Sequence, residues 1–110
     1  MPNVFKNYFV NNVGTSNTLI YTAPSGAQTT IIGISMCNIT TQTIQGSIFV
    51  APYTATNTFM IKGCSLTIGS AMVPVGGDQK LVLEANDSIY MYSNTSNAID
   101  AIVSVLEITP

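Results

Sequence analysis

Residues 73–93, VPVGGDQKLVLEANDSIYMYS, contain two apolar runs inside a stretch rich in turn-forming residues. Two candidate corners interrupt these runs, and the residues that form them are Gly76, Gly77, Asp78, Asn86 and Asp87. Glycine accepts the positive φ values of tight reversals, and Asn and Asp bond through their side chains to nearby backbone groups. The stretch therefore predicts a β-hairpin with structural corners, whose apolar side chains fill a core.

The same pattern repeats along the whole chain. Apolar runs alternate with Gly, Pro, Asn and Ser, and no run has a convincing helical period. The predicted strands are 4–10, 18–23, 29–39, 43–51, 57–62, 70–75, 80–84, 88–93 and 99–108. Pro74 lacks the N–H of a central strand, so its segment is predicted to be an edge strand or an extended approach to the hairpin. Nine short strands without a crossover helix predict one domain, residues 1–110, built as an antiparallel sandwich or barrel.

Two of the predicted strands, 29–39 and 99–108, are apolar on both faces. In the first, strict alternation places Ile34 and Met36 on one face and Ile31 on the other. A strand that is apolar on both faces must be covered on both, and a two-layer sandwich covers one. We therefore expect the second face to contact another subunit, through the residues Ile31, Ile39, Ile99, Val103 and Val105.

Charged side chains are scarce. The 110 residues include 3 basic side chains, 5 acidic ones and no His, which gives a net charge of −2. So few cations argue against binding to a phosphate backbone. A surface solvated mainly by hydroxyls and amides suits packing against other proteins, because free small domains usually rely on interspersed charges to stay apart. The competing interpretation is that Thr is common simply because it favours strands.

Catalysis and metal binding find little support in the sequence. Acid–base chemistry at neutral pH falls to His, which is absent, or to paired carboxylates. The acids Asp78, Glu84 and Asp87 flank the two predicted corners, where solvated turn residues are expected. Cys37 and Cys64 lack the short spacings of a zinc site. We expect no enzyme activity, no cofactor and no metal.

The N-terminal stretch MPNVFKNYFVNN lacks the apolar core of a secretion signal. No stretch approaches the ~20 apolar residues of a membrane-spanning helix. We therefore expect a chain made in a cytosol and not inserted in a membrane. In that reducing compartment Cys37 and Cys64 are expected to be reduced, buried thiols.

A saccharide surface is a further candidate site. Tyr53, Tyr90 and Tyr92, with the polar run SNTSN after them, would supply stacking faces and hydrogen-bonding amides. The alternative is that Tyr90, which stands between Ile89 and Met91, belongs to a strand with one buried face. Both interpretations stay open at this level.

Residues 72–110, MVPVGGDQKLVLEANDSIYMYS…IDAIVSVLEITP, resemble a family of small virion proteins of tailed bacteriophages, especially phages of marine bacteria and cyanobacteria. The runs VFKN, GTSNTLIYTAP and TTIIGISMCNIT in the front half look similar too, so the resemblance spans nearly the whole chain. It departs at Asn86, where the family pattern has Gly. Asn also tolerates the left-handed backbone region, so the corner can survive.

The resemblance implies an all-β structural protein of the virion, an antiparallel β-sandwich of jelly-roll type made in the cytoplasm of the bacterial host. It further implies a homo-oligomer, with a trimer favoured, that contacts the major capsid protein or tail proteins. The leading hypothesis is a capsid decoration, or cement, protein that stabilises the shell through repeated contacts. The alternative is a tail, neck or fibre-associated subunit that contacts a host-surface glycan.

Overall fold

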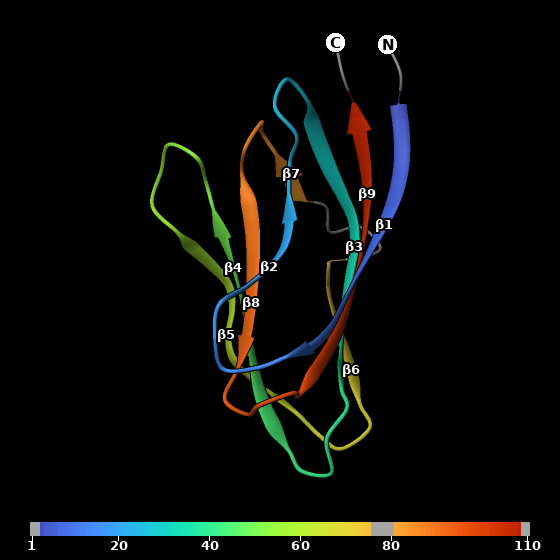
Figure 1. Ribbon diagram of the computed structural model, residues 1–110, viewed down its shortest axis with the longest axis vertical. Coiled ribbons are helices and arrows are strands. Elements are labelled where there is room, and N and C mark those ends of the chain that lie inside the picture. The colour runs from blue at the N-terminus through green and yellow to red at the C-terminus, as the bar shows by residue number, and fades with distance from the viewer. Residues whose placement is uncertain (1–2, 76–80, 109–110) are drawn as a thin grey trace.

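The computed structural model describes residues 3–75 and 81–108, and all of its regular elements are strands. The strands are β1 (Asn3–Val13), β2 (Thr18–Thr22), β3 (Gln28–Asn38), β4 (Ile44–Ala51), β5 (Thr58–Leu66), β6 (Ala71–Val75), β7 (Leu81–Leu83), β8 (Ser88–Ser93) and β9 (Ile99–Ile108). They form two antiparallel sheets that face each other (Figure 1). The predicted all-β class is confirmed, and each predicted run matches a strand to within a few residues. No helix in these ranges could cross a membrane.

The strand order is that of a jelly roll. One sheet, the β1 sheet, has the order β1-β9-β3-β6 with β7 also paired to β3, and the β2 sheet has the order β2-β8-β4-β5. With β6 and β7 counted as one interrupted strand, eight strands form two four-stranded sheets, and every connection except that from β4 to β5 crosses between the sheets, as in a jelly roll. The ends of the described chain lie side by side because Asn3 pairs with Ile108 (Figure 1). β6 is an edge strand, where the missing N–H of Pro74 is tolerated.

The predicted hairpin over residues 73–93 is wrong. β6 pairs with β3 through Val75 and Ile34, and β7 pairs with β3 through Leu83 and Thr29. Both pairings are antiparallel, so β6 and β7 run in the same direction along one edge of β3. Two apolar runs around a Gly-Gly pair are compatible with a reversal or with one interrupted strand, and only long-range pairing decides between them. Gly76, Gly77 and Asp78 lie outside the described residues.

The second predicted corner carries the chain from one sheet to the other, since β7 and β8 belong to different sheets. Asn86 adopts φ 70°, in the left-handed region that Asn tolerates. The Asp87 carboxylate accepts hydrogen bonds from the backbone N–H groups of Tyr53, at 2.9 Å, and Glu84, at 3.0 Å. The backbone of Ala23 bonds to both corner residues, at 2.8 and 2.9 Å. The acidic side chain is thus used to hold the corner together.

The core lies between the two sheets. Ile34 and Met36 of β3 pack in one cluster with Ile48 of β4 and Met91 of β8, and each is at most 1% exposed. Fully burying one such side chain contributes about 1.5–3 kcal/mol to folding. Ile89 of β8 is also fully buried. Ile89 and Met91 therefore form the inward face of β8, as their alternation with the tyrosines predicts.

The predicted subunit interface is largely wrong, because four of its five residues lie in this core. Ile31, Ile99, Val103 and Val105 are 0% exposed. The pairing of β3 with β9 shifts between Ile31 and Gly33, which is a β-bulge that brings Ile31 onto the same face as Ile34. These residues already contact the opposite sheet and cannot contact a second subunit. Ile39, which follows the end of β3, is 41% exposed.

Candidate functional site

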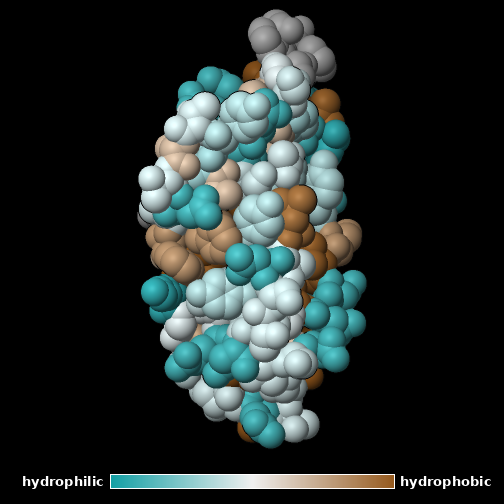
Figure 2. All heavy atoms as spheres, turned by 60° about the vertical axis from the view of Figure 1, so that its left-hand side comes forward, coloured by the Kyte–Doolittle hydropathy of each residue, from teal (hydrophilic) through white to brown (hydrophobic). Residues whose placement is uncertain are grey.

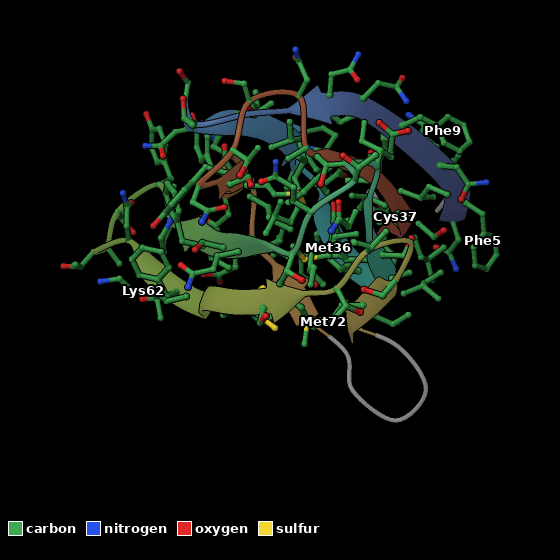
Figure 3. The ribbon with its side chains drawn as sticks, turned by 90° about the horizontal axis from the view of Figure 1, so that it is seen from below. Phe5, Phe9, Met36, Cys37, Lys62 and Met72 are labelled. Atoms are coloured by element: carbon green, nitrogen blue, oxygen red, sulfur yellow. The ribbon has the colours of Figure 1, made fainter. Side chains whose placement is uncertain are left out.

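The outward face of the β1 sheet carries an unusual amount of exposed apolar surface. Two rows of side chains cross the sheet there. In one row Phe9 lies opposite Ile102, and in the other Phe5 lies opposite Leu106. We call this surface the apolar face, and define it by its exposed members Phe5, Phe9, Val73, Val82 and Ile102. Phe5 is 71% and Phe9 68% exposed, and both project away from the ribbon (Figure 3).

The apolar face is also hollowed. A depression of about 160 Å³ is lined by Gly33, Ile34, Ser35, Val73, Ile102 and Ser104. Between the two rows, Ser104 donates a hydrogen bond to Asn7 at 2.8 Å. The face thus combines projecting rings with a shallow depression and uncharged polar groups between them.

The sequence contains a partial signal for this face. In 4–10, Phe5 and Phe9 alternate with Lys6 and Tyr8, so one pair must face outward. Apolar side chains are expected to face inward, but here the lysine and the tyrosine face the sandwich, where both contact Glu107. The buried carboxylate thus decides which face of β1 points to solvent.

The outward face of the β2 sheet carries a row of aromatic rings. Phe49 of β4 lies opposite Phe59 of β5 on one side and Tyr90 of β8 on the other. The Phe49 and Tyr90 rings stack with centroids 5.3 Å apart, and Phe59 lies 5.5 Å from Phe49. On this side of the molecule, hydrophobic side chains gather about midway along the long axis, between more hydrophilic ends (Figure 2).

A groove of about 290 Å³ runs beside this row and is lined by Asn17, Phe49, Asn57, Phe59 and Tyr92. Of the three tyrosines that the sequence proposes for a saccharide surface, Tyr92 lines the groove and Tyr90 supports Phe49. Tyr53 is 72% exposed and lies outside the lining. The sequence gives no signal for Phe49 and Phe59, because only the register of three strands brings their rings together.

Glu107 is the centre of a charged cluster between the sheets. Although it is only 6% exposed, its carboxylate accepts hydrogen bonds from Tyr21, at 2.7 Å, and from Tyr8, at 3.5 Å. Lys6 completes the cluster with an ion pair at 2.9 Å. Every buried side-chain polar atom among the residues that the structure places has a partner. The desolvation of this carboxylate is compensated by these partners, so that removing one of them would leave a buried charge incompletely paired.

The chemistry of this cluster is unsuited to proton transfer. Burial raises the pKa of Glu107, but the hydrogen bonds from Tyr21 and Lys6 and the Lys6 charge outweigh it, so that the pKa lies below its ordinary value. Burial raises the pKa of Tyr21 far above its ordinary value. At neutral pH the carboxylate is therefore a weak base and the phenol a weak acid.

The two thiols are free and half-buried, less buried than the sequence predicts. The sulfur of Cys64 lies 3.4 Å from that of Met72, and the Cys37 thiol lies 3.8 Å from the carbonyl oxygen of Asn38. Over residues 3–75 and 81–108, no three His, Cys, Asp or Glu side chains gather as metal ligands do. The features that stand out are therefore two surfaces, the apolar face and the aromatic groove.

Comparison with known proteins places the chain by its fold. No protein-family model matches it, and no curated protein sequence matches it significantly. A chain from the structure of Bacillus endospore appendages, described as disulfide-linked pili, superposes with a TM-score of 0.58 at 11% identity, over 97% of this chain and 88% of that one. A chain from the acid-stable capsid of Helicobacter pylori bacteriophage KHP30 gives 0.57 at 10% identity, over 98% and 89%.

The class that these observations define is a jelly-roll β-sandwich, whose fold occurs in a phage capsid and in a bacterial pilus. At 10–11% identity the likeness concerns the fold. Because the matches cover nearly all of this chain and most of each neighbour, the whole sandwich is shared.

Proposed function

We propose that this chain is a structural subunit of a tailed-phage virion, a capsid decoration protein that stabilises the shell. In this proposal it forms a homo-oligomer through the apolar face, and a trimer is the favoured state. The observation that carries the proposal is the exposure of Phe5 and Phe9, 71% and 68%, on the outward side of a fully formed sheet. The resemblance to small tailed-phage virion proteins supports the same role.

The size of the apolar face suits a contact between subunits. The two phenylalanine rings alone expose on the order of 200–300 Å², and the apolar face adds three further side chains. The largest apolar patch on a typical monomer is about 300–600 Å² and often has a function. A stable interface buries roughly 800 Å² on each partner. In this proposal the apolar face forms the centre of such an interface and its polar surroundings form the rim.

The charge distribution also suits self-association. The residues between the two apolar rows, such as Asn7 and Ser104, are uncharged. Two identical copies that meet over these rows therefore do not oppose like charges there; Asp100, which shares the outward face of β9, lies beyond Ile102 and accepts a hydrogen bond from the Asn12 backbone N–H at 3.1 Å. The depression beside Ile102 is a place where a side chain projecting from a second copy would fit. The jelly-roll fold, which recurs in a phage capsid, is consistent with such an assembly.

The test is the mass of the protein in solution. Sedimentation velocity and light scattering on the purified chain at micromolar concentration are expected to give one defined oligomer. The double variant Phe5→Ser, Phe9→Ser is expected to sediment as a monomer and to keep its β-sheet circular dichroism, because both side chains lie outside the core. A matched control is Ile68→Ser, which removes a side chain that is 62% exposed but lies in the turn between β5 and β6 and is not a member of the apolar face. A monodisperse wild-type monomer would contradict the proposed self-association.

The second candidate function is a tail, neck or fibre-associated subunit of the virion. It is favoured by the likeness to a pilus protein, because the same fold builds a filament there. Copy number separates the two, since a shell decoration protein is present in hundreds of copies and a tail protein in a handful. Quantifying the protein band from purified virions decides between them. Absence of the band would count against both.

A further inference from the structure

The aromatic groove, lined by Asn17, Phe49, Asn57, Phe59 and Tyr92, is a second surface that the proposed role in assembly does not use. It lies on the β2 sheet, and Figure 3 places Lys62, at its rim, on the opposite side of the molecule from Phe5 and Phe9. A contact through the apolar face therefore leaves the groove open. Its volume of about 290 Å³ is close to the lower end of the ~300–1,000 Å³ of small-molecule sites. That size suits a ligand of one or two rings.

The aromatic side of the groove is held in place before any ligand arrives. Phe49 is 6% exposed and is packed between Tyr90 and Phe59, so it acts as a support. Phe59 is 43% exposed, and Tyr92 approaches it edge-on at 6.3 Å. An exposed ring on such a support offers a flat apolar face without losing side-chain entropy on binding. This is the surface that the C–H face of a sugar ring can cover.

The polar side of the groove is made of amides. Asn17 precedes β2 and Asn57 precedes β5, and both residues line the groove. Both asparagines are exposed, so their side-chain amides are open to a ligand that enters the groove. Each amide supplies donors and an acceptor, which match neighbouring hydroxyls that both donate and accept.

The lack of charged lining residues in the groove favours a neutral ligand. None of its five lining residues is charged, and the Lys62 amine lies 5.1 Å from the Phe59 ring centroid. A single lysine at the rim cannot follow a phosphate backbone, which argues against single-stranded nucleic acid although its bases also stack on aromatic rings. Asn17 and Asn57 are exposed to water, and a purely apolar ligand that covered them would replace that water without offering a hydrogen bond. A neutral, hydroxyl-rich ring satisfies both sides.

We propose that the groove between Phe59, Tyr92, Asn17 and Asn57 binds a neutral saccharide. The ring stacks on Phe59 while its hydroxyls bond to the two amides. This proposal does not depend on the assembly role, because a monomer would present the same groove.

The test is an NMR titration of the ¹⁵N-labelled full chain with glucose, galactose, mannose and N-acetylglucosamine, each up to millimolar concentration. At least one sugar is expected to shift the backbone signals of Asn17, Asn57 and Phe59, and to leave those at the apolar face unchanged. Phe59→Leu keeps an apolar side chain on the strand but removes the ring, so affinity is expected to fall about tenfold. Phe59→Tyr is expected to restore it, which separates stacking from a general effect on folding.

The matched control is Tyr53→Ala, which removes an exposed aromatic ring from the loop that carries Asn57 but lies outside the lining. Its affinity is expected to stay within about twofold of wild type. The proposal is overturned if none of the four sugars shifts these signals, or if Tyr53→Ala weakens binding as much as Phe59→Leu. It is also overturned if uridine binds the groove more tightly than every sugar, because the site would then recognise bases.

Discussion

The Tyr21 hydroxyl donates a 2.7 Å hydrogen bond to the Glu107 carboxylate across the interior of the sandwich. Tyr21 lies in β2 and Glu107 in β9, so this bond joins the two sheets. The same hydroxyl lies 2.9 Å from the hydroxyl of Thr29 in β3. One phenol and one carboxylate thereby hold together the end of the sandwich where the described chain begins and ends (Figure 1).

Removing the Tyr21 hydroxyl is expected to destabilise the fold. Tyr21→Phe keeps the ring but takes a hydrogen bond from a buried carboxylate, which costs about 1.5–3 kcal/mol. Urea unfolding followed by circular dichroism measures the change. The control is Tyr53→Phe, at an exposed position, where no change is expected. An unfolding midpoint for Tyr21→Phe equal to that of the wild type would show that the bond adds nothing.

The stability is expected to fall in acid because of Glu107. Its pKa in the folded chain lies below the ordinary value of about 4.5. A carboxyl with a lowered pKa contributes stability that is fully present above its unfolded pKa and is lost as the pH falls through its folded pKa. Urea midpoints measured from pH 7 to pH 2 should therefore drop below about pH 4.5. Glu107→Gln should be less stable at pH 7 but lose less stability in acid, and parallel curves would refute this.

Adding a side chain at Gly46 is expected to destabilise the fold. A Cβ built there would lie 2.5 Å from the Cε of Met36 and 3.1 Å from the Cδ1 of Ile99, both of which are fully buried. Gly46→Val should therefore cost about 1–3 kcal/mol by overpacking the core. Gly14→Ala is the control, since its Cβ would meet its nearest atoms at 3.5 Å or more. Thermal melting compares the two, and a Gly46→Val variant as stable as the wild type would mean that the core can repack.

At position 86, replacement of Asn86 by Gly is expected to destabilise the fold less than replacement by Ala. The Asn86 φ of 70° is in the left-handed region, where a Cβ costs about 1–2 kcal/mol. Asn86→Ala should lower the melting temperature, while Asn86→Gly should change it little, because Gly adopts this conformation freely. If both variants melt at the same temperature, the corner does not depend on that backbone conformation.

Much of the fold could be predicted from the sequence because strand formation is read from local patterns. The nine apolar runs and their separators predict the strands, and the alternation of Ile89 and Met91 with Tyr90 and Tyr92 predicts which side of β8 is buried. The Asn-Asp pair predicts the corner that Asn86 and Asp87 form. Each inference needs only neighbouring residues and the period of two.

Pairing between distant strands decided the rest. The bulge after Ile31 turned a predicted interface residue into core, and the shared partner β3 turned a predicted hairpin into one interrupted edge strand. The register also brought Phe49 and Phe59 side by side. The sequence by itself determined which segments are strands and, where no bulge interrupts the alternation as in β8, which residues share a face. Only the tertiary structure decided which face of β1 points inward, where Ile31 lies and which distant side chains meet, because these depend on register and bulges set by contacts far apart in the chain.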